Sequence, residues 1–187
     1  MASDPRPRLS PDEYLALERH TDTKSEYLDG EIFAMAGASR QHNRIVLNVA
    51  SALDAQLKAK GCEVYASEMR VKIQRTGLYT YPDVIVACGE PRFEDAEVDT
   101  LLNPQVILEV LSKSTEDYDR GTKFLQYRAL PSLVEYILIA KDRTHVEHHL
   151  RQSEGWLLTE TSSREDVLVL PSCGARLALA DVYDRVF

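Results

Sequence analysis

The stretch YPDVIVACGEPRFEDAEVDTLLNPQVILEVLSKST, residues 81–115, contains two apolar runs typical of β-strands, joined by an acidic segment without periodicity. Each run has one carboxylate among its hydrophobic side chains, Asp83 in the first and Glu109 in the second. An ionised carboxylate is costly to bury unless it pairs with a cation or binds a metal ion. We therefore expect both strands to lie in a buried sheet and each carboxylate to have a partner.

Two kinds of partner are consistent with this pattern. A single carboxylate at a strand end most often accepts hydrogen bonds from backbone amides or pairs with an arginine. Two carboxylates on neighbouring strands, however, come within reach of each other across a gap of about 5 Å, and a divalent cation then offsets their repulsion. Because the ligands are oxygens and the histidines lie elsewhere in the sequence, we expect magnesium or manganese rather than zinc.

The composition is that of a folded protein, and we expect one domain over residues 1–187. Hydrophobic residues make up 44% of the chain and charged residues 28%. The net charge of −8 argues against a protein that coats nucleic acid nonspecifically, although it is compatible with a local basic cleft. No apolar run reaches the roughly 20 residues that span a membrane, and no signal peptide is visible, so the predicted location is cytoplasmic.

The three cysteines, Cys62, Cys88 and Cys173, are far apart in the sequence. Their spacing matches neither a zinc site nor a disulfide framework. We expect them to be reduced and buried.

Hydrophobic periodicity and turn residues define the other elements. Helices are predicted at 10–18, where Ser10 can act as the N-cap, and at 39–60, where Gly61 ends the longest helix. Asp29-Gly30 predicts a tight hairpin. Strands are predicted at 62–74, with a break or a bulge in the middle as an alternative to one continuous strand, and at 78–88, 104–112 and 133–140. A second long helix is predicted at 115–130, shorter antiparallel strands at 144–151, 155–160 and 165–170, and a C-terminal helix at 177–187. The fold class is therefore α/β (α+β), with a mixed central sheet and extra C-terminal antiparallel strands.

Five ordered blocks carry a family resemblance: YLDGEIFAMAGAS, YPDVIV, NPQVILEVLSKST, YDRGTKFLQYRAL and VEYILI. Together they resemble the Uma-two family of putative restriction endonucleases, within the PD-(D/E)XK nuclease superfamily. The resemblance extends over about residues 25–140 and weakly to the C-terminus. It implies a restriction-endonuclease-like core of helix, three strands, helix and strand at about 39–140, which agrees with the order of elements predicted above.

The resemblance also implies an activity, the metal-dependent (magnesium or manganese) hydrolysis of phosphodiester bonds in DNA. Asp83 and Glu109 would hold the metal, and a lysine would position the attacking water or offset charge on the phosphate. Leu111 stands where the family usually has that lysine. Lys113 and Lys123 are the replacements, and we place the role on Lys123, with Tyr127 one helical turn beyond it. A solvated surface lysine paired with Asp119 is the alternative for Lys123.

Glu26 and His42 complete the candidate catalytic residues. Glu26 precedes the hairpin within a block typical of the family, and a surface carboxylate is the alternative. His42 lies in the first turn of the long helix, where capping or packing is the alternative. If Asp83 and Glu109 repel each other without metal, replacing either by alanine should keep or raise thermal stability.

Other charged residues have simpler interpretations. His145, Glu147 and His149 share one face of a predicted strand, which resembles a zinc motif but is better explained as an exposed edge. A phosphate-tracking groove or a set of solvated faces would account for the basic residues Arg70, Lys72, Arg75, Lys113, Arg120 and Arg128.

A nuclease fold that has lost its lysine can instead serve as a binding module. Leu111 and the acidic net charge favour that alternative. In either case a homo-oligomer, most simply a dimer, is expected.

Overall fold

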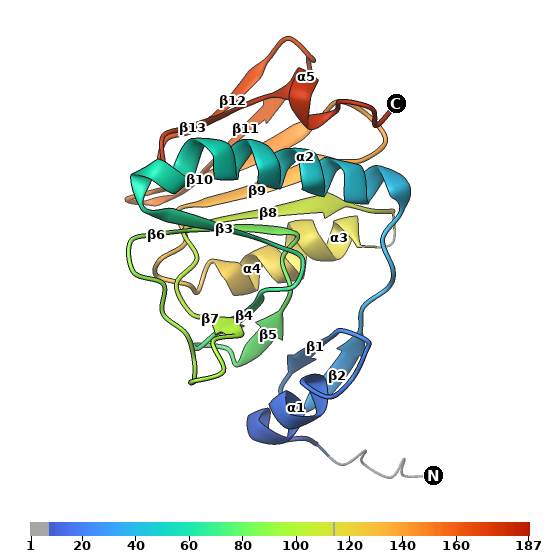
Figure 1. The fold of residues 1–187 in the computed structure, drawn as a ribbon, viewed down its shortest axis with the longest axis vertical. Coiled ribbons are helices and arrows are strands. Elements are labelled where there is room, and N and C mark those ends of the chain that lie inside the picture. The colour runs from blue at the N-terminus through green and yellow to red at the C-terminus, as the bar shows by residue number, and fades with distance from the viewer. Residues whose placement is uncertain (1–7, 114) are drawn as a thin grey trace.

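A six-stranded mixed sheet forms the centre of the computed structural model, which describes residues 8–113 and 115–187 (Figure 1). Strands β8 and β9 are parallel, and the other neighbours in this sheet are antiparallel. The spatial order is β11 (Gly155–Thr161), β10 (Val146–Gln152), β9 (Glu135–Ala140), β8 (Val106–Leu111), β6 (Val84–Cys88) and β3 (Cys62–Ala66).

A smaller five-stranded sheet lies beside it, near helix α1 (Pro11–Glu18). Its hairpin turns at Asp29-Gly30, where both residues have positive φ angles of 49° and 88°, as a two-residue turn requires. The spatial order is β2 (Glu31–Ala34), β1 (Ser25–Leu28), β5 (Leu78–Thr80), β4 (Arg70–Ile73) and β7 (Thr100–Leu101). A separate hairpin consists of β12 (Val167–Leu170) and β13 (Ala175–Ala178).

Helices cover both faces of the larger sheet (Figure 1). On one face lies α2 (Arg40–Leu57), which continues as a 3-10 turn, η1 (Lys58–Lys60), and ends at Gly61 in the left-handed conformation. On the other face lies a composite helix of α3 (Glu116–Tyr118), a π-helical turn η2 (Asp119–Lys123) and α4 (Phe124–Tyr127). A short helix, α5 (Leu179–Val182), packs near α2. No helix in the described ranges is long and apolar enough to cross a membrane.

The alternation of side chains along β8 sets the position of Glu109. Val106, Leu108 and Val110 pack in the core on the α2 side, whereas Ile107 and Leu111 pack on the α4 side with Tyr127. Side chains two residues apart share a face of a sheet. Glu109 therefore points toward the composite helix, and Leu111 occupies a buried apolar position beside it.

The predicted core order of helix, three strands, helix and strand is confirmed, with one addition. Two predicted strands each divide between the two sheets: 62–74 becomes β3 and β4, and 78–88 becomes β5 and β6. The second break falls at Pro82, which has no N–H to donate to a sheet. Asp83 therefore lies at the junction of the sheets, directly before β6.

Three other boundaries differ from the sequence-based prediction. The segment 89–103 contains β7, which pairs with β4 in parallel. The helix predicted at 115–130 is interrupted by the π turn. The predicted C-terminal helix at 177–187 is largely replaced by β13 and the short α5, because the side chains of β13 alternate between buried and more exposed positions, as those of a strand do.

The expectation of three reduced cysteines is wrong for one pair. Cys62 and Cys88 are register partners on β3 and β6 and form a disulfide, while Cys173 has a free thiol. Sequence spacing does not reveal this pair, because the register of two strands brings the cysteines together.

Reduction of this disulfide is expected to lower the free energy of unfolding by about 3 kcal/mol, because the bond closes a loop with a sequence separation of 26. Urea denaturation with and without reductant measures the change, and Cys173→Ser should leave the difference intact. Thiol titration of the denatured chain should find one free thiol before reduction. Free thiols at all three cysteines before reduction would contradict the prediction.

Candidate active site

Asp83 and Glu109 lie together at one end of the larger sheet. The register pairs Val84 with Leu108, so the next positions, Asp83 and Glu109, are neighbours. The Asp83 amide nitrogen is 3.4 Å from Glu109 Oε2, and the Val110 amide donates to Asp83 Oδ2 at 2.7 Å. The structure thus brings the two carboxylates together, as their strand positions predict.

Lys123 reaches this pair from the composite helix. Its Nζ is 2.9 Å from Glu109 Oε1, 3.4 Å from Glu26 Oε1 and 3.7 Å from Asp119 Oδ1, and its side chain is only 6% exposed. Lys113 is exposed and forms no ion pair with either strand carboxylate in the part of the chain that the structure describes. Lys123, and not Lys113, is therefore the lysine that lies beside the carboxylates.

The π turn explains how the helix presents both charges inward. Asp119 and Lys123, its first and last residues, are buried and form an ion pair across the turn. Such turns are rare and occur often at functional sites because they shift side chains around the helix axis. The pairing of Lys123 with Asp119, expected in the surface alternative, is present, but both side chains are buried, so the surface location is wrong.

Burial dominates the electrostatics of this cluster. It raises the pKa of Glu109 to about 8, while Lys123 opposes the shift and Asp83 adds to it. Burial alone would lower the pKa of Lys123, but Glu109, Glu26 and Asp119 outweigh it and hold that pKa well above its usual value. Lys123 is therefore a permanent cation that compensates buried carboxylates.

This compensation removes the premise that Asp83 and Glu109 simply repel each other without metal. Glu109 pairs with Lys123, and Asp83 accepts hydrogen bonds from the Val110 amide and from His42. Replacing either carboxylate by alanine should therefore cost stability instead of preserving or raising it.

His42 and Glu26 both belong to the cluster. His42 Nε2 lies 2.9 Å from Asp83 Oδ1, and Ser39 caps the start of α2 on which His42 sits. Glu26 on β1 is 8% exposed, so the surface alternative is wrong. Glu26 accepts hydrogen bonds from Thr80 and, at 3.0 Å, from Tyr118, two partners that the sequence did not indicate. The smaller sheet thus contributes one wall of the site.

Tyr127 contacts Glu109 directly. Its hydroxyl donates to Glu109 Oε1 at 2.8 Å, and its side chain is fully buried between helix and sheet. The same Oε1 pairs with Lys123. Tyr127 therefore helps to fix the orientation of the Glu109 carboxylate.

Tyr127→Phe is expected to lower the free energy of unfolding by about 1 to 3 kcal/mol, because it removes a buried hydrogen bond and leaves Glu109 Oε1 without this donor while keeping the ring. Urea denaturation measures the change. Tyr65→Phe is the matched control, since its hydroxyl contacts Glu63 at the surface and should change stability by no more than about 0.5 kcal/mol. Equal losses of unfolding free energy in both variants would show that the buried hydrogen bond contributes no more than the surface one.

His145, Glu147 and His149, the three residues that resemble a zinc motif, are not arranged as metal ligands in the structure. His145 Nε2 is 3.6 Å from Glu147 Oε1, which instead pairs with Arg120, and His149 packs against the Phe124 ring at 4.5 Å. The prediction of an exposed edge is wrong, because β10 lies between β9 and β11 and Glu147 is buried. Glu147 instead links β10 to the composite helix.

The donor chemistry of Asp83 and Glu109 fits a hard divalent cation. Across residues 8–113 and 115–187, no three His, Cys, Asp or Glu side chains are arranged to enclose a metal ion. Magnesium does not need such a cage, since it is commonly held by one or two carboxylates, with waters and phosphate oxygens completing the shell. Three carboxyl groups around the ammonium of Lys123, with Asp83 beside Glu109, also leave room for another positive charge.

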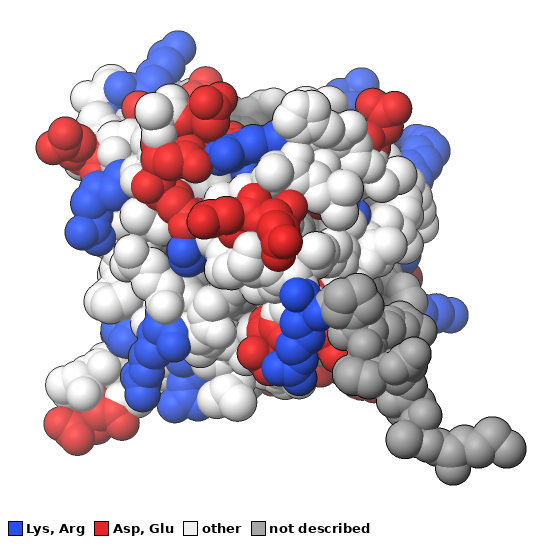
Figure 2. All heavy atoms as spheres, turned by 90° about the horizontal axis from the view of Figure 1, so that it is seen from below, with Lys and Arg blue, Asp and Glu red and all other residues white. Residues whose placement is uncertain are grey.

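The six basic residues of the proposed groove have different environments. Arg70 pairs with Asp99 at 2.8 Å, Lys72 with Glu94, and Arg120 with Glu147, so their charges are compensated. On the face in Figure 2, acidic side chains form a central band and several separate groups, and lysines and arginines are dispersed among them. The remaining three, Arg75, Lys113 and Arg128, are exposed, and two of them, Arg75 and Arg128, line a common hollow.

Comparison with known proteins gives concordant matches. The family model Uma2, described as "Putative restriction endonuclease", matches residues 11–180. The "Uncharacterized protein sll1609" of Synechocystis sp. is 40% identical over 153 residues, which cover 81% of this chain and 86% of that protein. The "Uncharacterized protein slr1290" of the same organism is 36% identical over 182 residues, covering 97% and 94%.

A solved structure shares the fold. The crystal structure of "a putative nuclease belonging to DUF820" from Anabaena variabilis superposes with a TM-score of 0.74 at 20% identity, over 94% of this chain and 98% of that one. At this level of identity the match shows the fold alone.

Proposed function

The chain belongs to the Uma2 family, and from that membership we propose that it is a divalent-metal-dependent endonuclease that hydrolyses phosphodiester bonds in DNA. The observation that carries the proposal is the 2.9 Å contact between Lys123 Nζ and Glu109 Oε1, beside Asp83. This contact supplies a buried cation next to two carboxylates, although Leu111 fills the usual lysine position.

Asp83 and Glu109 would hold the metal ion. When bound, a divalent cation polarises a phosphate and lowers the pKa of a coordinated water. The remaining residues of the cluster have positioning roles: His42 orients Asp83, Tyr127 orients Glu109, and Glu26 and Asp119 hold Lys123. Their mutual contacts preorganise the site before substrate binds.

Lys123 would act on the phosphate itself. Its ammonium is fixed by three carboxylates and carries its charge throughout the physiological pH range, because its pKa is raised. A fixed donor of this kind stabilises the negative charge that develops on a phosphate during hydrolysis, without having to reorganise. Asp83 and His42, with side chains 17% and 15% exposed, are the more accessible members and mark the side from which substrate would enter.

Incubation of the purified protein with supercoiled plasmid tests the proposal. Nicked or linear DNA should appear with magnesium or manganese and should not appear with EDTA. A matched RNA substrate shows whether the sugar is discriminated. A protein that neither cleaves DNA nor binds manganese calorimetrically would overturn the proposal in favour of a catalytically degenerate binding module.

We include a homodimer in the proposal, because one site hydrolyses one strand and a pair of sites related by a two-fold axis can cut both. Light scattering in the presence of duplex DNA measures the mass. Linear product from a strictly monomeric protein would remove the need for the dimer.

A further inference from the structure

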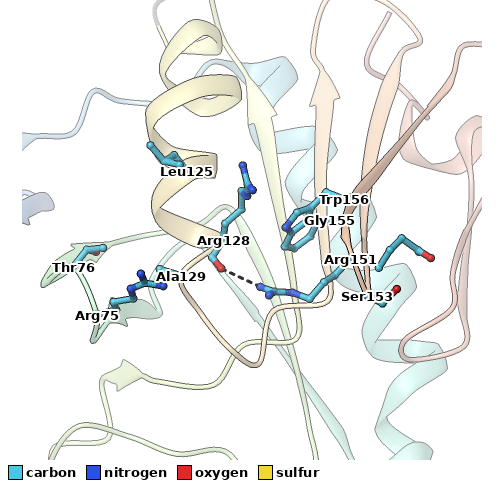
Figure 3. Close-up of a pocket in the computed structure, with 10 residues that line it drawn as sticks. Arg75, Thr76, Leu125, Arg128, Ala129, Arg151, Ser153, Gly155 and Trp156 are labelled. Atoms are coloured by element: carbon cyan, nitrogen blue, oxygen red, sulfur yellow. Dashed lines mark hydrogen bonds between the residues drawn. The ribbon is translucent and has the colours of Figure 1, made fainter.

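A hollow of about 490 Å³ with positive charge lies at the C-terminal end of α4 (Figure 3). The β4–β5 turn, the end of α4 and the β10–β11 hairpin form its walls, and none of the carboxylate cluster lines it. Four residues, Arg75, Arg128, Arg151 and Trp156, give it its chemical character, and we call it the arginine hollow. No acidic residue is among the described residues that line it, although the chain has 30 of them. A concave surface of one sign attracts ions of the opposite sign.

Arg151 is a fixed part of the wall. Its Nε donates to the Leu133 carbonyl at 2.6 Å, and its Nη2 donates to the carbonyls of Leu130 at 2.9 Å and Arg128 at 3.2 Å. Its guanidinium also lies 4.6 Å from the centre of the Trp156 ring. These contacts hold the cation and the indole in one arrangement, because backbone carbonyls and a ring face restrain the planar group from several sides.

Arg75 and Arg128 are available to a ligand. Both are exposed, and within the described ranges neither forms an ion pair with a carboxylate. In Figure 3 Arg128 projects between α4 and Trp156, and Arg75 approaches from the opposite wall. Burial and the neighbouring Arg128 lower the pKa of Arg151, which agrees with uncompensated positive charge in the hollow. Guanidinium groups bind phosphates through paired N–H donors.

We propose that the arginine hollow binds a backbone phosphate of a nucleic-acid strand, with Arg75 and Arg128 as phosphate ligands and Arg151 as the fixed cation behind them. This inference rests on the proposed nuclease function, because the strand would be the substrate. The composite helix connects the two sites: Lys123 and Arg128 are five residues apart, roughly 7 Å along a helix axis. A phosphate contact outside the catalytic cluster would position the strand without reading its sequence.

Trp156 is the only tryptophan in the chain, so its fluorescence reports directly on the hollow. Duplex and single-stranded oligonucleotides are titrated into the Asp83→Asn protein, which separates binding from cleavage. The emission should change and saturate with at least one of them. Arg75→Glu and Arg128→Glu should each weaken binding at least about tenfold and reduce the slope of log K against log salt by about one.

Lys58→Glu is the matched control, because Lys58 is equally exposed but lies on η1, outside the hollow. It should bind as tightly as the parent protein. Unchanged tryptophan emission, or arginine variants that bind as the parent does, would overturn the inference. Inorganic phosphate that reproduces the full change over the same concentration range would also overturn it, in favour of a small-anion site.

The outcomes separate this inference from the proposed function. If the wild-type protein cleaves plasmid and the arginine variants bind normally, the proposed nuclease function stands and the proposed phosphate site in the arginine hollow is wrong. If binding is saturable and depends on the arginines but no metal supports cleavage, the hollow is a nucleic-acid site and the proposed nuclease function is wrong.

Discussion

Lys123→Met is expected to reduce DNA cleavage by about 10²- to 10³-fold or more and to lower the free energy of unfolding by about 3 to 5 kcal/mol. Methionine keeps the length of the side chain but removes the charge. Three buried carboxylates, Glu26, Glu109 and Asp119, then lose the ammonium that lies within 3.7 Å of each. Plasmid cleavage at a temperature where the variant is folded, together with urea denaturation, measures both effects.

The loss of stability and the loss of activity can be separated. Adding Glu26→Gln to Lys123→Met removes one of the uncompensated charges, so the double variant should recover part of the stability but none of the activity. Lys113→Met is the matched control, since Lys113 is exposed and should keep wild-type stability and nearly wild-type cleavage. Wild-type cleavage by Lys123→Met would show that the catalytic lysine is assigned to the wrong residue.

Asp83→Asn and Glu109→Gln are each expected to lower cleavage by about 10³-fold, because a carboxylate that holds the metal contributes several kcal/mol to the transition state. Both replacements keep the size of the side chain. In Asp83→Asn, the oxygen of the new side-chain amide can still accept the hydrogen bond from the Val110 backbone amide, so the fold should persist. Cleavage rates at saturating magnesium and manganese measure the effect.

Thermal denaturation with manganese supplies an independent measurement. Wild-type protein should gain about 2.7 kcal/mol of stability when the metal is at roughly 100 times its Kd, and the two amide variants should lose most of that gain. His145→Asn should retain the metal-induced gain in stability, because His145 lies beside Glu147 on β10, outside the carboxylate cluster. Equal metal-induced shifts in the wild type and all of these variants would show that the ion binds elsewhere.

The sequence predicts the carboxylate pair because each of two consecutive apolar runs contains one carboxylate, and a buried carboxylate needs a partner. Alternation along β8 places Glu109 on a buried face, and the run after Pro82 places Asp83 beside it. The family resemblance then directs attention to Lys123. All six candidate site residues, Glu26, His42, Asp83, Glu109, Lys123 and Tyr127, lie in one connected cluster.

The features that escaped prediction depend on long-range geometry. Two predicted strands divide between the sheets, near Ser67 and Pro82; a break or bulge in the first was expected, but nothing in the hydrophobic pattern marks a change of sheet. The Cys62–Cys88 bond depends on strand register, which is a tertiary property. The π turn, whose end residues Asp119 and Lys123 are buried, is not marked in the hydrophobic pattern either.

The π turn also ties the catalytic arrangement to the exact length of this segment. A π turn holds one residue more than an α turn, so deleting Gly121 would make the helix regular while leaving its two flanking halves in nearly the same relative orientation. Tyr118, Tyr127 and Leu130 could keep their contacts, but Asp119 and Lys123 would be three residues apart instead of four, and the ion pair between them would have to change. A change of length here would therefore alter the ion pair of the site without disrupting the helix, and a homologue lacking this one residue could retain the fold while losing the geometry around its lysine.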